Sequence, residues 1–134
     1  MTAMTADIVL PVELADENDI PLISGAVVFE GSAVGLHLGY ARALVYNDIF
    51  AGHAIRAVDN SGGVSGVKSV HVRSGTYRLQ VTLASVAQSN VTDAVYMTYD
   101  GTYTLDSTLA VEVGRVARYV TTDTCVVEFT ALAL

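Results

Sequence analysis

Residues 67–83 read VKSVHVRSGTYRLQVTL, and their pattern decides the fold class. Val70 and Val72 alternate with polar residues, and apolar residues recur at every second position from Tyr77 to Leu83. A period of two is typical of a strand with one buried face. The pair Ser74-Gly75 separates the two runs, and glycine permits the positive φ of tight turns. The sequence therefore predicts a β-hairpin centred on this pair.

Two further hairpins are predicted towards the C-terminus. Asp100-Gly101, a favoured pair for a type I′ turn, lies between VYMTY (residues 95–99) and TYTL (residues 102–105). Residues 113–121 and 124–132 form another pair of apolar runs that a short polar turn joins. Turn-closed pairs at such short spacing indicate antiparallel β-structure.

The last two runs differ in their patterns. Cys125, Val127 and Phe129 would share one face of their strand, which predicts a buried side. Residues 113–121 lack a clean alternation, because both faces are half apolar. This pattern favours a strand that is covered on both sides, as a neighbouring subunit would cover it.

The remaining segments complete an all-β pattern. Short apolar runs occur at residues 26–29 and 33–38, and residues 84–92 leave room for one turn of helix at most. Strands at this regular spacing indicate a compact antiparallel β-barrel or sandwich of the jelly-roll or tulip type. We expect an extended N-terminal arm over residues 1–20 and a single β-domain over residues 21–134.

The composition points to assembly. The 134 residues, 14.1 kDa, fit one domain. Charged residues make up 16% of the chain, against roughly 25% in ordinary soluble proteins. The mean hydropathy is +0.45, yet no apolar run approaches the ~18 residues of a membrane helix. We therefore expect the chain to bury surface in an oligomer or a larger assembly, without a membrane partner.

The charge balance argues against nucleic acid as a partner. Seven Lys and Arg residues stand against 14 Asp and Glu residues, for a net charge of −7, and a field of this sign repels phosphate backbones. The N-terminus carries no basic residue before its short apolar patch, so no signal peptide is expected. Cys125 is the single cysteine, which suits synthesis in a reducing cytoplasm and a place in the core.

No catalytic, cofactor or metal site is expected from the residues. His37, His53 and His71 come from different predicted strands without an HxH or HxxxH pair, and we interpret them as surface or rim histidines. The loop SGGVSG, residues 61–66, is not followed by the Lys-Ser/Thr of a phosphate-binding loop. Asp106 is interpreted as a turn residue. The chain is therefore not expected to be an enzyme.

Two segments are the candidate interface. In the arm, an apolar patch precedes an acidic run, and Pro11 confines any strand there to an edge, where it could pair with a neighbour. On the predicted second hairpin, tyrosines favour core and interface packing over a sugar-stacking platform. The candidate interface residues are Ile8, Val9, Leu10, Pro11, Val12, Tyr99, Tyr103 and Arg118.

A series of short features between Val34 and Phe129 occurs in a distinctive order. They are Gly39-Tyr40, Arg42, Leu44, residues 48–52 (DIFAG), residues 59–61 (DNS), Gly66, residues 70–73 (VHVR), Gly75, Val95-Tyr96, residues 100–105 (DGTYTL), residues 114–116 (GRV) and residues 126–129 (VVEF). In this order and spacing they resemble a known family, the small head-decoration or capsid cement proteins of tailed bacteriophages. The family usually has a glycine, and often a proline, just before the Val95-Tyr96 pair, where this chain has Thr92 and Ala94.

The resemblance implies a structural virion protein without catalytic residues. Such a protein would assemble as a homotrimer on the outer capsid surface and would stabilise the shell by bridging subunits of the major capsid protein. It would be made in the host cytoplasm and reside in the virion. Two rival interpretations remain: a sugar- or host-surface-binding β-sandwich module, and a cupin-like metalloenzyme with clustered His and Glu ligands.

Overall fold

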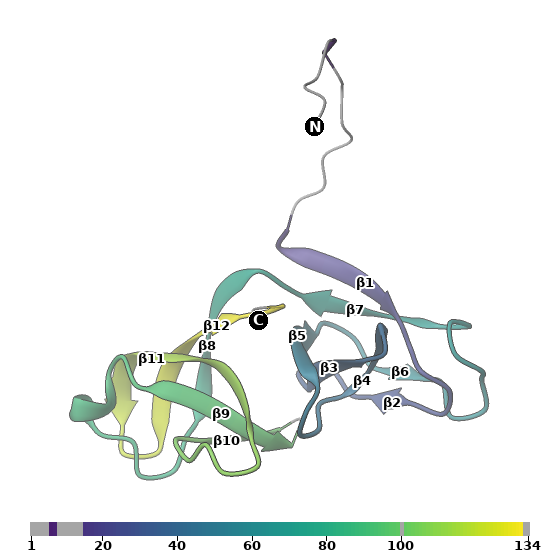
Figure 1. Ribbon diagram of the computed structural model, residues 1–134. Helices are drawn as coiled ribbons and strands as arrows, with labels where there is room; N and C mark the ends of the chain where they lie inside the picture. The colour runs from purple at the N-terminus through teal and green to yellow at the C-terminus, as the bar shows by residue number, and fades with distance from the viewer. Residues whose placement is uncertain (1–5, 8–14, 100, 133–134) are drawn as a thin grey trace.

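The computed structural model describes residues 6–7, 15–99 and 101–132, and it confirms the all-β prediction (Figure 1). In this part of the chain the only helical segment is the 3₁₀ turn η1, Gln88–Asn90. The strands are β1 Glu17–Pro21, β2 Val27–Val28, β3 Ala33–His37, β4 Tyr40–Ala43, β5 Ile49–Ala54, β6 Val58–Asp59, β7 Ser69–Arg73, β8 Thr76–Thr82, β9 Ala94–Tyr99, β10 Thr102–Thr104, β11 Val111–Thr121 and β12 Thr124–Thr130.

The first large sheet has the strand order β1-β7-β5-β3-β4, and all its pairs are antiparallel. A parallel bridge between Leu22 and Ala41 brings the two ends of this sheet towards each other. Strands β2 and β6 form a separate antiparallel pair. The side chains between these elements form a core of small and branched residues: Ile20, Leu22, Val28, Val34, Ala41, Ala51, Ala54, Val70 and Val72.

The second large sheet has the strand order β10-β9-β11-β12-β8, again with antiparallel pairs only. Its core includes the predicted row on β12, since Cys125, Val127 and Phe129 are fully buried. Ala33, Leu44 and Phe50 from the first half of the chain belong to the same cluster. The two sheets therefore pack on each other, and because neither closes on itself, the fold is sandwich-like and not a barrel.

The predicted hairpin at Ser74-Gly75 is wrong. Both edges of β7 are occupied, by β1 and by β5, so β8 cannot pair with it. At Gly75 the backbone has φ +72°, and the chain bends there into the second sheet, where β8 pairs with β12 (Figure 1). The glycine was therefore a correct signal for positive φ, but it marks a passage between sheets.

The two C-terminal hairpins are confirmed. Tyr99 pairs with Thr102 at the β9–β10 turn, while Asp100 lies outside the described residues. Strands β11 and β12 pair antiparallel as predicted. The mixed pattern of β11 has an internal cause, because its registers shift between Glu112 and Gly114 and between Val116 and Arg118. Such bulges change which face a residue occupies, so no covering subunit is needed to explain the pattern.

The folded domain begins before the predicted end of the arm at residue 20. Its last residues belong to β1, where Glu17 pairs with Arg73 and the buried Ile20 pairs with Val70. The apolar patch at residues 8–12 lies outside the described residues, so its contacts stay a prediction.

An alanine substitution at Gly52 tests the β-bulge in the pairing of β5 with β3. Gly52 has φ +124°, and a Cβ built there would lie 1.9 Å from the carbonyl oxygen of Arg73. We expect Gly52→Ala to lower the free energy of unfolding by about 2 kcal/mol or more, through backbone strain and displacement of β7. Gly62→Ala is the control, because a Cβ there has no atom within 4 Å. Equal urea midpoints for the two variants would contradict the structure.

Candidate interaction surface

Exposed apolar side chains gather where β3, β4 and β5 meet. Tyr40 pairs with His37 across the β3–β4 turn, which carries Leu38 at 85% exposure. Ile49 begins β5 opposite Leu36, near the same turn. The loop between β4 and β5 adds Val45 and Tyr46.

A second loop extends this surface. Val64 and Val67 are 67% and 63% exposed, and a Cβ at the intervening Gly66 would lie 3.8 Å from the Tyr40 ring. The buried Asn60 holds this loop, because its Nδ2 donates to the carbonyl oxygens of Ile23 (3.1 Å) and Val64 (3.2 Å). We call the combined surface the apolar end; it comprises Leu38, Tyr40, Val45, Tyr46, Ile49, Val64 and Val67.

An ion pair between the partly exposed Arg42 and the buried Asp48 fixes the β4–β5 loop. The Arg42 guanidinium donates through Nε to Asp48 Oδ2 (3.0 Å) and through Nη2 to Oδ1 (2.7 Å). The same carboxylate accepts the backbone N–H of Val45 at 3.2 Å. A Cβ at Gly35 would lie 2.5 Å from Asp48 Oδ2, so only glycine leaves room for this carboxylate. The hydrogen bonds that Arg42 donates to Asp48 raise the pKa of Arg42 above its ordinary value.

Removal of the Arg42 guanidinium should lower stability, because the buried Asp48 carboxylate then has no charged partner. The Asp48 side chain is 1% exposed, so Arg42→Ala leaves an uncompensated charge in the interior. We expect a loss of about 3 kcal/mol in the free energy of unfolding. Arg78→Ala is the matched control, because the Arg78–Glu128 pair lies on the surface and should contribute less than about 1 kcal/mol. A chemical-denaturation series that ranks the two variants equally would refute this account.

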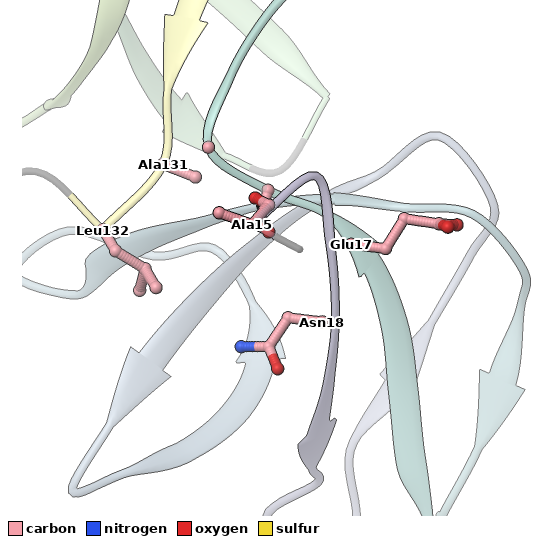
Figure 2. Close-up of a pocket in the computed structure, with 7 residues that line it drawn as sticks. Ala15, Glu17, Asn18, Ala131 and Leu132 are labelled. Atoms are coloured by element: carbon pink, nitrogen blue, oxygen red, sulfur yellow. Dashed lines mark hydrogen bonds between the residues drawn. The ribbon is translucent and has the colours of Figure 1, made fainter. Parts of the chain in front are cut away.

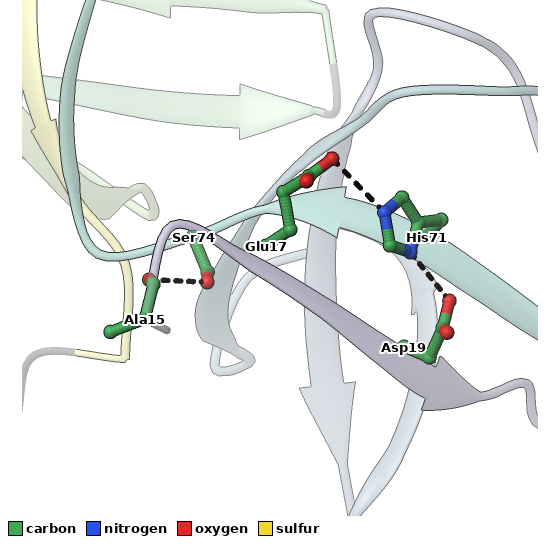
Figure 3. Close-up of polar contacts among 5 residues, drawn as sticks. All are labelled: Ala15, Glu17, Asp19, His71 and Ser74. Carbon is green, nitrogen blue, oxygen red and sulfur yellow. Dashed lines mark hydrogen bonds and ion pairs between the residues drawn. The ribbon is translucent and has the colours of Figure 1, made fainter. Parts of the chain in front are cut away.

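Polar contacts tie β1 to β7 at the opposite end of the first sheet (Figure 3). His71 lies between two carboxylates, with Nδ1 2.7 Å from Asp19 and Nε2 3.0 Å from Glu17. Hydrogen bonds to Asp19 and then to Glu17 raise the pKa of His71 above its ordinary value. The Ser74 hydroxyl donates to the carbonyl oxygen of Ala15 at 2.9 Å. These contacts fasten the start of β1 to the bend at Gly75.

An open hollow of about 330 Å³ lies beside this bend (Figure 2). Asn18 on β1 and Leu132 after β12 face it, and Gly75 forms part of its wall. Among the described residues that line it, Glu17 is the one ionisable side chain, and its carboxylate is already paired with His71.

His53 is buried between the two sheets, so its interpretation as a surface or rim residue is wrong. Its Nδ1 lies 2.6 Å from the hydroxyl of Tyr77 on β8, and its Nε2 lies 2.9 Å from that of Tyr103 on β10. The ring also packs edge-on against Phe129, with centroids 4.6 Å apart. A neutral imidazole can donate from one nitrogen and accept at the other, so His53 can bridge the two edge strands of the second sheet.

Burial governs the protonation of this cluster. Desolvation lowers the pKa of His53 to about 4, and the positive charge of Arg73 acts in the same direction. Burial raises the pKa of Tyr103 to about 12 and raises that of Tyr77 as well. All three groups are therefore neutral at pH 7, and the bridge carries no net charge.

Acid should weaken the fold through His53. Because its folded pKa of about 4 lies below the ordinary value of 6.5, the unfolded chain binds the proton first. Stability from this group is complete above pH 6.5 and is lost as the pH falls towards 4, by roughly 2 kcal/mol at pH 5. The measurement is the free energy of unfolding of the wild type and of His53→Gln between pH 7 and 5. Parallel curves for the two proteins would contradict the buried neutral histidine.

Other reactive groups in the described part of the chain are dispersed or buried. No group of three or more His, Cys, Asp and Glu side chains there is arranged to hold a metal ion. Cys125 is buried, and desolvation raises the pKa of its thiol, so the reactive thiolate is disfavoured. Within the same residues, no helix has the length and apolar character needed to cross a membrane.

The three candidate interface residues that the structure describes, Tyr99, Tyr103 and Arg118, do not share one surface. Tyr99 is 66% exposed on β9, and Arg118 is exposed on β11. Tyr103 instead turns inward to His53, so it belongs to the packing between the sheets. The five arm residues lie outside the described residues. Sequence reasoning missed the apolar end, although Leu38 beside the turn residue Gly39 was a usable signal for an exposed apolar tip.

Comparison of the chain with protein-family models, with curated proteins and with solved structures found no match.

Proposed function

We propose that this protein is a structural component of a bacteriophage virion that decorates the outer capsid surface. It stabilises the shell by bridging neighbouring subunits of the major capsid protein and performs no catalytic step. The observation that carries the proposal is the apolar end, together with the resemblance to capsid cement proteins. Its seven exposed apolar side chains, on β4, β5 and three neighbouring loops, are suited to permanent contact with another protein.

The charge pattern of this region supports a protein partner. Between Leu36 and Ile49 the only charged residues are Arg42 and Asp48, and these neutralise each other. The part of the apolar end on β4, β5 and the two turns beside them can therefore be buried without desolvating an unpaired charge, which would otherwise cost several kcal/mol. Full burial of one large apolar side chain contributes about 1.5–3 kcal/mol, so a few anchors suffice for firm attachment.

The backbone at Thr92 supports the family resemblance. Thr92 has φ +80°, a conformation that glycine adopts freely and that a β-branched residue adopts at a cost. The decoration proteins usually have a glycine at this point of the pattern. The departure in this sequence therefore concerns the residue type, while the local turn has the geometry that a glycine there would favour.

Assembly as a homotrimer is part of the proposal. The low charge content and the exposed Leu132 after β12 leave surface for contacts between copies. In a shell, each copy adds contacts at the joints between capsomers, and many modest contacts together stabilise the particle. The net charge of −7 would keep decorated particles from adhering to one another.

A second candidate function is binding of sugars or of a host surface. The observation in its favour is the exposure of Tyr99, Tyr46 and Tyr40, since aromatic rings stack on sugar faces. Tyr40 and Tyr46 belong to the apolar end, whereas Tyr99 lies on β9 of the second sheet, so the three rings do not form one platform in one subunit. Selective binding of the purified protein to a glycan array would favour this candidate over capsid decoration.

A charge placed in the apolar end should abolish attachment. We expect Leu38→Lys to weaken binding to undecorated shells at least tenfold, because the ammonium group would be desolvated at the contact. Leu109→Lys is the control, since Leu109 is also exposed but lies in the β10–β11 loop of the second sheet. Co-sedimentation with capsids stripped of the protein measures both. Equal retention of the two variants on the capsids would show that the contact lies outside the apolar end.

A further inference from the structure

The outer face of the second sheet carries charged side chains on three neighbouring strands. Arg115 on β11 lies opposite Glu128 on β12, and Glu128 lies opposite Arg78 on β8. Arg118 follows on β11, opposite Val126. The three arginines are exposed, whereas the residues directly beside them in each strand are half-buried or buried. We call Arg78, Arg115, Arg118 and Glu128 the arginine face.

The arginine face has the opposite sign to the rest of the molecule. Three arginines and one glutamate give it a charge of +2 (3 − 1), while the whole chain carries −7, so all other residues together carry −9 (−7 − 2). Glu112, which is exposed three residues before Arg115 on β11, would reduce the local charge only to +1. A positive surface on an acidic protein is complementary to an acidic surface, and such complementarity selects the partner and the register of a contact.

The guanidinium groups of this face have donors that the subunit itself does not use. Arg78 Nε donates to Glu128 Oε1 at 3.0 Å, and Arg115 Nη1 donates to the carbonyl oxygen of Thr92 at 3.1 Å. Among the described residues each of these two groups makes this one bond, so its other N–H donors can bind a carboxylate. Within the same part of the chain, Arg118 has no hydrogen bond or ion pair.

A hollow of about 200 Å³ opens beside Arg78 and Arg115. Val91 and Ala117 are among its apolar lining residues, and Glu128 also lines it. Arginine is suited to bind carboxylates, because its planar fork matches the two carboxylate oxygens. An Asp or Glu side chain that enters the hollow would therefore meet guanidinium donors at its tip and apolar contacts along its stem.

The same chain carries an acidic surface at the edge of its first sheet. Asp16, Glu17 and Asp19 are exposed at the start of β1, which is an edge strand of that sheet. Figure 3 shows Glu17 and Asp19 in contact with the two sides of His71. Since Arg73 lies opposite Glu17, this group has a charge of −2 (1 − 3), or −1 when His71 is protonated. We call Asp16, Glu17, Asp19 and Arg73 the acidic edge.

We propose that the arginine face of one copy binds the acidic edge of the next copy, and that this contact closes the homotrimer of the proposed function, on which the assignment rests. The two surfaces belong to different sheets, so the contact is head-to-tail. Head-to-tail contacts close into a ring when the rotation between copies is suitable, and a ring of three uses each surface once per copy. A two-fold contact through the arginine face would instead place arginine against arginine, and such like charges repel each other.

Both halves of this contact occur on one chain, which identifies a second copy as the partner. Two copies with a charge of −7 repel each other, but salt screens this repulsion beyond a Debye length of about 8 Å. At contact the opposite charges of the arginine face and the acidic edge are the nearest groups, and the Coulomb energy is largest at the shortest distances. The local attraction therefore decides how two copies meet.

Charge reversal on the arginine face tests the contact in the full chain. Arg118→Glu replaces an attraction by a repulsion and should raise the dissociation constant of the trimer at least tenfold. Arg56→Glu is the matched control, because Arg56 is exposed between β5 and β6 and its reversal changes the net charge by the same amount. This control should change the constant less than about threefold. Sedimentation equilibrium measures both, and a wild-type monomer at all concentrations or equal effects of the two variants would overturn the proposal.

Reversal of both surfaces provides the second test. Arg115→Glu with Arg118→Glu turns the arginine face negative, and Asp16→Arg with Asp19→Arg turns the acidic edge positive. Each pair alone should abolish the trimer, whereas the fourfold variant has the net charge of the wild type and should recover its dissociation constant to within about fivefold. Far-UV circular dichroism and thermal melting show whether each variant is folded. Folded two-residue variants that stay trimeric, or a folded fourfold variant that stays monomeric, would contradict the contact.

Binding to capsids stripped of the protein separates this contact from the proposed function. A charge-dependent trimer without affinity for capsids would support the contact between copies and refute capsid decoration. If Arg118→Glu formed trimers like the wild type but no longer co-sedimented with capsids, the arginine face would contact the shell and not a second copy. That result would overturn the contact between copies and leave capsid decoration standing.

Discussion

The bend at Gly75 is the constraint on which the two-sheet arrangement depends. One continuous run, residues 68–83, supplies a strand to each sheet, and its inward face changes between them: Val70 and Val72 are buried in β7, whereas Tyr77 and Leu79 face the core from β8. A left-handed glycine permits this change within one residue. The contacts of Ser74 with Ala15 and Asp16 and of Gly75 with Ala131 hold the bend from both sides.

Two buried polar groups then fix the positions of the sheets and loops relative to one another. His53 from the first sheet reaches hydroxyl groups on both edge strands of the second, so it fixes the distance between β8 and β10. Asp48 accepts from Arg42 and from the backbone of Val45, so it fixes the loop that carries part of the apolar end. Both groups are costly to bury without partners, and this cost makes alternative packings unfavourable. The exposed apolar side chains are therefore presented by a rigid frame.

Alternation and turn residues were sufficient to predict the all-β class and two of the hairpins. They were insufficient at Gly75, because a period of two shows which face of a strand is buried but not which strand lies beside it. The bulges in β11 were not predictable either, since an extra residue changes the face without a residue type that marks it. His53 looked like a rim residue because its partners, Tyr77 and Tyr103, are 24 and 50 residues away. The apolar end was not predicted, because turn residues were interpreted only by their backbone geometry.

The placement of charged side chains bears on the proposed assembly. Several of the few charged side chains are used internally or between neighbouring strands, as in Arg42–Asp48, Arg78–Glu128 and the contacts of His71. The net charge of −7 consequently acts as a diffuse field, while the apolar end has no unpaired charge of its own. A diffuse acidic field hinders nonspecific association over a Debye length, about 8 Å at physiological salt, but it does not oppose burial of an uncharged patch at close range. Subunits with such a patch can repel one another at long range and still bind a surface whose shape matches the patch, which the proposed attachment to a preformed shell requires.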